Sequence, residues 1–422
     1  MPSSGDEARS NRYLRTVTFA DYPRALTSQA DAGTVTSLRE RNRALALTHI
    51  LRRRQTTRAE LARACGLSPA SAGNLVADLI EDGLVVESGS RSSRGGRPIA
   101  VIAPNATGAY AIGADVGERG VAVEMFDLSL KMVDREFRGG GKQESPEAIE
   151  ADLRDAIGAL KARNGARWSR VLGVGLGLPG VVEVSESGGQ VLYAQSLGWD
   201  PMVIPTDFAD GLPVFAENGA KTLAKAELWF GAASGIDHAL VALLGRGIGM
   251  GVIAHGQMAH GAFSSASEWG HTKVNVDGRE CRCGGRGCLE AYVGADALLA
   301  AWRAAGGTPD GDGWRALGGL LDAAAAGDTT AGHVVDDAVH VLGVALGSMV
   351  NMTNPRRIII GGWVGLRLME RHALAIRDAV LANCLDRFGE QVDVTAATFG
   401  GDTVALGSAL MPVEALIYGE SV

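Results

Sequence analysis

The sequence feature that most constrains this chain is a cluster of one histidine and three cysteines within eighteen residues. Its members are His271, Cys281, Cys283 and Cys288. One imidazole and three thiolates complete a tetrahedral Cys₃His set, which is the arrangement of a structural zinc site. Gly284, Gly285 and Gly287 lie among the cysteines and let the backbone turn sharply around a metal, because glycine reaches positive φ without steric cost.

Two other interpretations of the cysteines are a chance cluster and a local disulfide. A Cys-x-Cys pair is too short for an ordinary disulfide, and the only other cysteines are Cys65 and Cys384. The spacing therefore favours metal ligation. Because four protein ligands leave no position for water, we expect the zinc ion to hold the loop together and to have no catalytic role.

Two carboxylates, Glu268 and Glu290, flank this cluster. Carboxylates on a loop that a metal makes rigid are well placed to accept hydrogen bonds from polyhydroxylated ligands. The motif Glu-x-Gly-His, followed by Cys-x-Cys-Gly-x-x-Gly-Cys-x-Glu, resembles the signature of the ROK family. That family groups sugar kinases with sugar-responsive repressors.

The length and composition of the chain indicate an intracellular protein of two or three domains. Its 422 residues are 46% hydrophobic, which is ample for real cores. We find no secretory segment near the N-terminus and no apolar run long enough to span a bilayer. Five cysteines, three of them in the metal cluster, are typical of a reducing compartment. We therefore expect a cytoplasmic protein without a membrane partner.

The net charge of −8 conceals an asymmetry along the chain. Residues 38–103 hold 11 Arg, no Lys and 6 acidic residues, which gives a local charge of +5. Residues 104–422 carry a charge of −13. A basic module on an acidic body indicates that only the first part of the chain binds nucleic acid.

Residues 36–105 have the pattern of a winged helix-turn-helix, whereas residues 1–35 are polar and aperiodic, which predicts a disordered arm. Thr57 and Glu60 form a capping box that opens one helix, and Ser68-Pro69 opens the next. Two apolar strands around a loop rich in glycine and arginine then predict a β-hairpin wing. The alternative is a helix-turn-helix used only for protein packing, but the local positive charge argues against it.

In such a module the start of the second of these helices enters the major groove, and the wing contacts phosphates or the minor groove. The predicted DNA-binding residues are Pro69, Ala70, Ser71, Asn74, Arg91, Arg94 and Arg97. The segment also resembles the winged helix of ROK repressors, including Gly-Leu-Ser at 66–68 and Gly-Arg-Pro at 96–98.

Residues 106–422 alternate strands and helices, which predicts a layered α/β domain. Residues 109–117 and the strand that follows them resemble the first phosphate hairpin of the actin-like ATPase fold. The resemblance implies a first lobe of about residues 106–217 together with the C-terminal helix 403–422. The second lobe would then span about residues 218–402 and carry the zinc loop.

Several positions argue against sugar kinase activity. Kinases of the ROK family place a catalytic Asp directly after an Asn at a strand end, whereas here Gly219 follows Asn218. Their first phosphate loop continues with a Gly-Thr pair where this chain has Glu118-Arg119, and Arg246 replaces a usual hydroxyl residue in a second glycine loop. Loss of a catalytic base commonly lowers a rate by about 10²–10⁴. We therefore predict a protein that is not an enzyme and has no catalytic residues.

A sugar site is nevertheless implied by the resemblance. Its residues are Gly180, Asn218, Glu268, His271 and Glu290. In this site, one ring nitrogen of His271 would bind zinc while the other faces the sugar. The alternative is that the acids only support the zinc loop, because carboxylates commonly surround metal ligands.

Together these features predict a sugar-responsive DNA-binding transcriptional regulator, specifically a repressor. Its expected partners are operator DNA and a sugar or sugar-derived effector. Because palindromic operators match two-fold proteins, we expect a homodimer or a dimer of dimers. The rival hypotheses are a DNA-tethered ROK sugar kinase and a ROK regulator controlled by a protein partner instead of a sugar.

Overall fold

The computed structural model describes residues 35–92, 98–117, 120–139, 145–185, 189–401 and 403–419, except for the side chains of residues 35–37 and 314. The predicted disordered arm, apart from residue 35, lies outside the described residues, and so do Arg94, Arg97 and Glu118-Arg119. The chain forms two compact units, Met1–Asn105 and Ala106–Val422.

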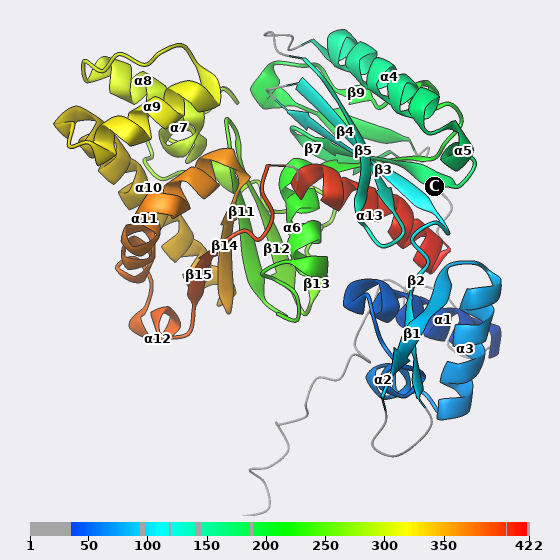
Figure 1. Cartoon of the computed structure of the whole chain (residues 1–422). Coiled ribbons are helices and arrows are strands. Elements are labelled where there is room, and N and C mark those ends of the chain that lie inside the picture. The colour runs from blue at the N-terminus through cyan, green and yellow to red at the C-terminus, as the bar shows by residue number, and fades with distance from the viewer. Residues whose placement is uncertain are drawn as a thin grey trace, which may run out of the picture. The chain divides into compact units, whose positions relative to one another are not determined.

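Over its described residues, the first unit consists of three helices followed by a β-hairpin (Figure 1). Its elements are α1 (Val35–Arg53), α2 (Arg58–Ala64), α3 (Pro69–Glu81), β1 (Val85–Arg91) and β2 (Ile99–Pro104). The capping box is present, with the Thr57 hydroxyl accepting from the Glu60 N–H at 3.2 Å and the Glu60 carboxylate accepting from the Thr57 N–H at 2.8 Å. Such caps contribute about 1 kcal/mol each, so local sequence defines where α2 begins. The predicted winged helix-turn-helix is confirmed.

Apolar side chains and ion pairs hold the three helices of this unit together. Its fully buried side chains include Leu47, Ile50, Leu61, Val76, Leu79 and Ile102. At the surface, the guanidinium of Arg39 lies 2.7 Å from the carboxylate of Asp78, and that of Arg43 lies 2.8 Å from Asp82. Two arginines of α1 are thus directed toward α3.

The second unit contains two five-stranded sheets with the same topology. The first has the order β10-β6-β3-β4-β5 and comprises Val214–Asn218, Val171–Leu178, Tyr110–Gly117, Gly120–Asp127 and Met132–Arg138. The second has the order β13-β12-β11-β14-β15 and comprises Gln257–Met258, Ile248–Ala254, Ala239–Leu244, Arg357–Gly361 and Asp393–Ala396. In each sheet the first three strands along the chain are antiparallel, and the last two run parallel to the first. This repeated topology confirms the predicted two-lobed actin-like fold.

Helices cover both sheets (Figure 1). In the first lobe, α4 (Pro146–Arg163) packs on one face and α13 (Thr403–Tyr418) on the other, while a small sheet of β7 (Val181–Val184), β8 (Gln190–Tyr193) and β9 (Met202–Val203) lies nearby. In the second lobe, alternate strand residues face α6 (Gly219–Phe230) on one side and α10 and α11 on the other. The remaining helices are α5 (Gly165–Trp168), α7 (Glu290–Val293), α8 (Ala295–Ala304), α9 (Gly313–Ala325), α10 (Thr329–Thr353), α11 (Gly362–Leu381) and α12 (Asp386–Gly389).

Helix α10 is long and apolar enough, by length and composition, to cross a membrane, which corrects the expectation that no apolar run in the chain is long enough to do so. In the structure 56% of its apolar window is buried inside the domain. Its residues Val335, Leu342 and Leu346 belong to the core of the second lobe. The composition of α10 is therefore explained by packing against α11 and α9.

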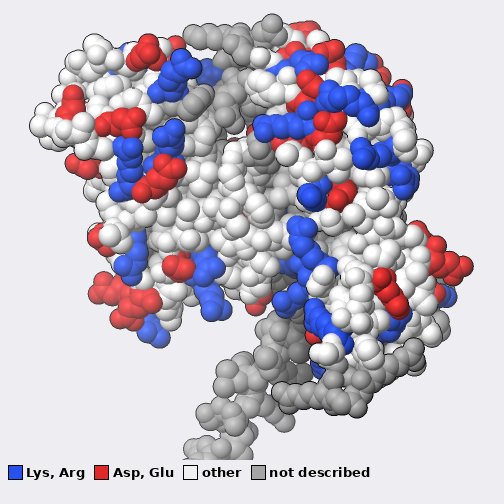
Figure 2. Space-filling view, in the orientation of Figure 1, with Lys and Arg blue, Asp and Glu red and all other residues white. Residues whose placement is uncertain are grey.

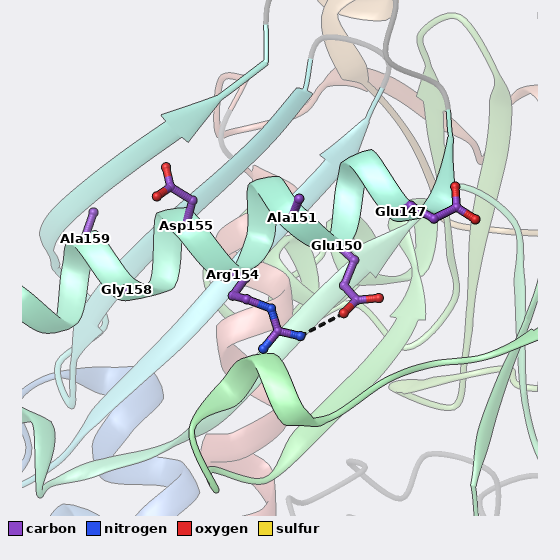
Figure 3. Close-up of a pocket in the computed structure, with 7 residues that line it drawn as sticks. All are labelled: Glu147, Glu150, Ala151, Arg154, Asp155, Gly158 and Ala159. Atoms are coloured by element: carbon purple, nitrogen blue, oxygen red, sulfur yellow. Dashed lines mark hydrogen bonds and ion pairs between the residues drawn. The ribbon is translucent and has the colours of Figure 1, made fainter.

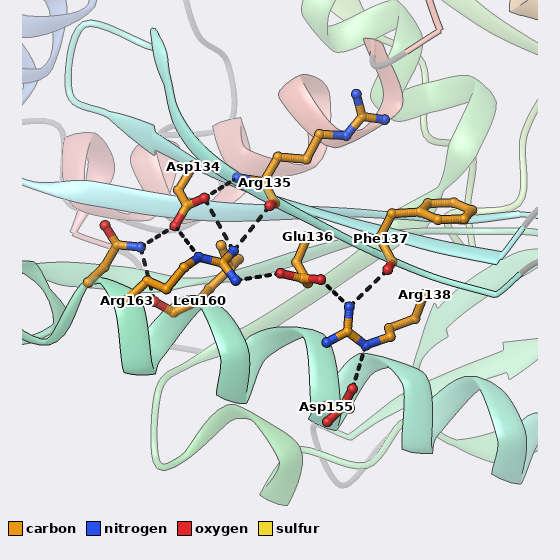
Figure 4. Close-up of polar contacts among 9 residues, drawn as sticks. Asp134, Arg135, Glu136, Phe137, Arg138, Asp155, Leu160 and Arg163 are labelled. Carbon is orange, nitrogen blue, oxygen red and sulfur yellow. Dashed lines mark hydrogen bonds and ion pairs between the residues drawn. The ribbon is translucent and has the colours of Figure 1, made fainter.

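A network of charged side chains joins α4 to the edge strand β5 (Figure 4). The Arg163 guanidinium contacts Asp134 at 3.0 Å and Glu136 at 2.6 Å, and Arg138 bridges Glu136 and Asp155. The hydrogen bond from Arg163 holds the pKa of the Asp134 carboxyl below its ordinary value. Acidic and basic side chains are intermixed over this region (Figure 2). Because these pairs are open to solvent, we assign the network a modest structural role.

Helix α13 lies directly on the backbone of its neighbours. A Cβ atom at Gly113 in β3 would stand 1.9 Å from the Ala405 carbonyl oxygen, and one at Gly175 in β6 would stand 1.9 Å from that of Ser408. A Cβ at Gly407 of α13 would stand 1.8 Å from the Thr222 carbonyl oxygen of α6. Glycine at these positions lets the last helix bring the first sheet and α6 into contact.

We expect Gly407→Ala to lower the free energy of unfolding by about 1–3 kcal/mol, because α13 and α6 would have to separate. Chemical denaturation monitored by circular dichroism measures this. The matched control is Gly158→Ala in the helix α4, where an added Cβ meets nothing within 4 Å and should stabilise the protein slightly. Equal stability of Gly407→Ala and the parent protein would contradict the packing argument.

Candidate metal centre and neighbouring polar groups

The four predicted metal ligands lie together between β13 and α7. Their ligand atoms all lie within 4.8 Å of one another. Nδ1 of His271 is 3.8 Å from Sγ of Cys281, and Sγ of Cys283 is 3.8 Å from Sγ of Cys288. A tetrahedron with metal–sulfur bonds of about 2.3 Å has edges of about 3.8 Å. The cluster therefore has the composition and size to hold a metal ion.

The metal loop, residues 268–290, depends on its glycines. Gly284 and Gly287 have φ values of 83° and 74°, which other residues rarely adopt. A Cβ at Gly287 would stand 1.6 Å from the carbonyl oxygen of Asn275. The N–H of Cys281 donates to the Gly285 carbonyl at 2.8 Å, closing the turn that brings the cysteines together.

Lys273 is a member of this centre that the sequence analysis missed. Its ammonium donates to Sγ of Cys288 at 2.9 Å, and this bond raises the pKa of Lys273. Three thiolates exceed the charge of a divalent ion by one, and Lys273 supplies the compensating positive charge. Burial raises the pKa of the Cys281 thiol to about 12, so a metal must displace that proton and metal affinity should increase with pH.

Glu290 is buried, and protein groups occupy both of its oxygens. Oε2 accepts from the N–H of Ile248 at 3.0 Å, and Oε1 lies 3.4 Å from the guanidinium of Arg282. Glu290 thereby joins the metal loop to the glycine loop that precedes β12.

Two other predicted sugar-site residues contact each other at the end of β10. Nδ2 of Asn218 donates to the carbonyl of Gly180 at 2.8 Å, and its Oδ1 accepts from the N–H of Ala220 and caps α6. Gly180 has a φ of 135°, and a Cβ there would stand 2.5 Å from the Tyr193 carbonyl oxygen. Contacts with the backbone thus fix the positions of both Asn218 and Gly180.

Glu268 and His271 are the remaining predicted sugar-site residues. The N–H of His271 donates to the Glu268 carbonyl at 3.2 Å in the short helix η5 (Trp269–His271). Desolvation raises the pKa of the Glu268 carboxyl, and the nearby acid Glu290 adds to this, while His271 and Lys221 oppose it. Nε2 of His271 lies 3.3 Å from the Ser196 hydroxyl.

Glu217, a buried acid directly before Asn218, contacts two basic side chains. Its carboxylate lies 3.5 Å from the ammonium of Lys221 and 3.5 Å from Nδ1 of His260. Burial alone would raise the pKa of Glu217, but the His260 hydrogen bond and the Lys221 charge outweigh this and hold the pKa below its ordinary value. The sequence does not reveal this group, because His260 lies far from Glu217 in the chain and only the fold buries Lys221 beside it.

The region implied for nucleotide binding is lined by interacting side chains. Nε of Arg246, which stands where a hydroxyl residue is usual, lies 2.7 Å from the carboxylate of Asp296. A Cβ at Gly245 would stand 3.4 Å from the indole nitrogen of Trp363, which directly follows the glycine pair at 361–362. At Gly219 a Cβ would meet no atom closer than 3.7 Å, so the backbone there accepts a Cβ in ordinary van der Waals contact.

The predicted DNA-reading residues are exposed at the start of α3. They are Pro69, Ala70, Ser71 and Asn74. The backbone N–H of Ser71 is occupied, since it donates to the Ser68 hydroxyl at 3.1 Å. Arg91 of the wing lies 3.3 Å from the Glu60 carboxylate.

A hollow on the outer side of α4 is separate from all of these residues (Figure 3). It is lined by residues of that helix alone, between Glu147 and Ala159, and by none of the predicted site residues. The dashed contact in it joins Arg154 to Glu150 at 2.8 Å. We assign no function to this hollow.

Comparison with known proteins agrees with the two-unit architecture. The ROK family model matches residues 111–414, which is well over half of the chain. This chain is a member of the ROK family. A model of the MarR family matches residues 40–97, within the winged helix of this ROK protein.

Two relatives and one solved structure are similar to this ROK protein over most of their length. A xylose repressor of Bacillus spizizenii is 26% identical over 91% of this chain and 98% of its own length. A glucokinase of Halalkalibacterium halodurans is 30% identical over 70% of this chain and 92% of its own length. A solved ROK family transcriptional regulator, a homologue of the Escherichia coli MLC protein, has a TM-score of 0.71 at 22% identity and covers 90% of this chain and 97% of its own. That structural likeness supports the fold alone.

Purified protein should contain about one metal ion per chain, and Cys283→Ser should lose it, because a four-residue site has no spare ligand. Elemental analysis after dialysis measures the content. Cys384→Ser, which removes a cysteine outside the cluster, is the matched control and should keep the metal. Full metal content in Cys283→Ser would refute the assignment of this ligand.

Proposed function

We propose that this protein is a sugar-responsive DNA-binding transcriptional regulator that acts as a repressor. The observation that carries the proposal is the fusion, in one chain, of a winged helix to a ROK domain that has Gly219 at the position of the catalytic acid. The xylose repressor of Bacillus spizizenii matches this chain across both units. We place the protein in the cytoplasm, where its operator DNA lies.

The DNA-binding surface in this proposal is the start of α3 together with the wing. Asn74 would read a base edge, since its amide can pair with adenine, and Ala70 suits contact with a thymine methyl group. Arg94 and Arg97 would contact backbone phosphates or the minor groove. A two-fold operator calls for a homodimer or a dimer of dimers.

The metal in this proposal is a structural zinc ion held by His271, Cys281, Cys283 and Cys288. Their composition supports zinc, because thiolate and imidazole ligands in a tetrahedral set suit it. Zinc when bound would hold the metal loop rigid. Two residues of this chain support the loop further: Lys273 offsets the negative charge of the thiolates, and Glu290 accepts a hydrogen bond from the N–H of Ile248.

The effector in this proposal is a sugar or sugar derivative. The candidate contact groups are Gly180, Asn218, Glu268, His271 and Glu290. Glu268 is the best placed of the acids to accept from a hydroxyl, because no described side-chain donor is bonded to its carboxylate, whereas both oxygens of Glu290 have protein partners. Glu290 would then position the site instead of binding the sugar directly.

We infer that the protein has no sugar kinase activity. The catalytic acid is absent at Gly219, and Arg246 is held by Asp296 instead of being available to a phosphate. Most of the catalysis in phosphoryl transfer comes from positioning the reacting groups. The absence of the acid and the engagement of Arg246 therefore both act against the reaction.

A DNA-tethered sugar kinase is the second candidate. Its support is the relation to the glucokinase of Halalkalibacterium halodurans at 30% identity. The two candidates differ in one measurement, the release of ADP from Mg-ATP in the presence of sugars.

Asn74→Ala should change which operator sequence is preferred, whereas Arg97→Ala should weaken binding to all sequences if Arg97 contacts phosphate. Binding measured by fluorescence anisotropy over a salt series should also show a steep salt dependence. Asn42→Ala in α1 removes an amide outside the proposed reading surface and serves as the control. An unchanged order of operator preference in Asn74→Ala would remove that residue from base recognition.

Gly219→Asp should tighten or alter sugar binding, by about 1.5–3 kcal/mol if the new carboxylate accepts a sugar hydroxyl. Gly219→Asn has nearly the same shape without the charge and is the matched control. Calorimetry with a panel of sugars measures binding, and a coupled assay measures ADP release. We expect no ADP release from either protein. Turnover by the parent protein would establish the kinase instead, and turnover by Gly219→Asp alone would show that its nucleotide site still works.

A further inference from the structure

The short helix η3 (Gln195–Leu197) connects the first lobe directly to the metal loop of the second. It lies between β8 and β9, and the buried residues Leu192 and Ala194 anchor the chain just before it in the core of the first lobe. The N–H of Leu197 donates to the Ala194 carbonyl at 2.9 Å. The turn is thus held by its own lobe and presents two polar side chains, Gln195 and Ser196.

Both of these side chains contact metal-ligand residues. Nε2 of Gln195 donates to the carbonyl of Cys283 at 2.7 Å. The hydroxyl of Ser196 lies 3.3 Å from Nε2 of His271. Two of the four ligand residues are therefore oriented by residues 88 and 75 positions away in the sequence.

The contact at His271 decides which ring nitrogen can bind a metal. Nδ1 faces the cysteines, at 3.8 Å from Sγ of Cys281. A neutral imidazole has one nitrogen with a proton and one with a lone pair. For Nδ1 to offer its lone pair to a metal, the proton must be on Nε2, and in the protein without a bound sugar the Ser196 oxygen can accept the hydrogen bond of that N–H.

We propose that Ser196 is a positioning residue of the metal centre, supplied by the opposite lobe. It selects the tautomer of His271 that binds metal and holds the ring in place, and Gln195 fixes the turn at Cys283. The occupancy of the metal site and the contact between the lobes are then linked, and each strengthens the other. The inference rests on the zinc site of the proposed function, although it requires neither a sugar nor DNA.

The test is the affinity of the full-length protein for zinc, measured by competition with a chromophoric chelator at fixed pH. Ser196→Ala should bind zinc about 10–100-fold more weakly than the parent protein, which is the usual loss when a partner of a metal-bound histidine is removed. Ser196→Thr keeps the hydroxyl and should retain the parent affinity. Substitution with Co²⁺ gives a second readout, since the visible absorption bands should change in Ser196→Ala and not in Ser196→Thr.

The matched control is Ser265→Ala. Ser265 also bonds across the lobes, to the Glu183 carboxylate at 2.8 Å, but no hydrogen bond described for its side chain involves a metal ligand. Ser265→Ala should therefore leave the zinc affinity and the Co²⁺ spectrum unchanged. Thermal unfolding of each variant checks that it is folded.

The outcomes separate this inference from the proposed function. A parent protein that binds no zinc would overturn both the zinc site and the role of Ser196. A parent protein that binds zinc, with an equal affinity in Ser196→Ala, would overturn the role of Ser196 alone. An equal loss in Ser196→Ala and Ser196→Thr would overturn it too, because the hydroxyl would not be the group that matters.

Discussion

The geometry of the ROK domain depends on the close packing of α13 against the backbone of β3, β6 and α6, where glycines leave no side chain between the elements. The helix rests on glycines of β3 and β6 and, through Gly407, on α6. The first turn of α6 is capped by Asn218, whose other amide atom holds Gly180. The last helix of the chain therefore helps to position Gly180 and Asn218, which lie at the ends of the neighbouring strands β6 and β10.

The metal loop is the second element on which the domain depends. Interactions between charged groups, as well as its backbone turns, hold it in place. Lys273 faces the thiolates, and Glu290 receives both the Arg282 guanidinium and the Ile248 N–H. A loop of residues with little apolar content thereby gains fixed contacts with β12 and with η3. Trp269 and Leu289, near the two ends of the loop, and Val293, just after it, are buried in the core of the second lobe, which anchors both ends of the loop.

The sequence predicted those parts of the structure that short-range chemistry determines. The starts of α2 and α3 follow from Thr57, Glu60 and Ser68, which act on backbone groups three residues away or fewer. The cysteine cluster was recognisable because its ligands lie close together in the chain. The bonds of Ile248 to Glu290 and of His271 to Ser196 could not be predicted, because they join segments that only the fold of the domain brings together. The apolar character of α10 was overlooked for a related reason, since only its neighbours show that it is a core helix.

The open space beside Gly219 has an evolutionary consequence. The nearest atoms to an added Cβ are the Leu178 carbonyl oxygen at 3.7 Å and a methyl group of Val404 at 3.9 Å, which are ordinary contact distances. The backbone at this point therefore accepts a Cβ without a shift of these neighbours, and a lineage could acquire or discard an acid here by a single codon change. The acid alone would not restore phosphoryl transfer, because Asp296 holds Arg246 away from a phosphate. In such a lineage the acid at position 219 and the phosphate-binding loop can therefore change at different times while the scaffold stays the same.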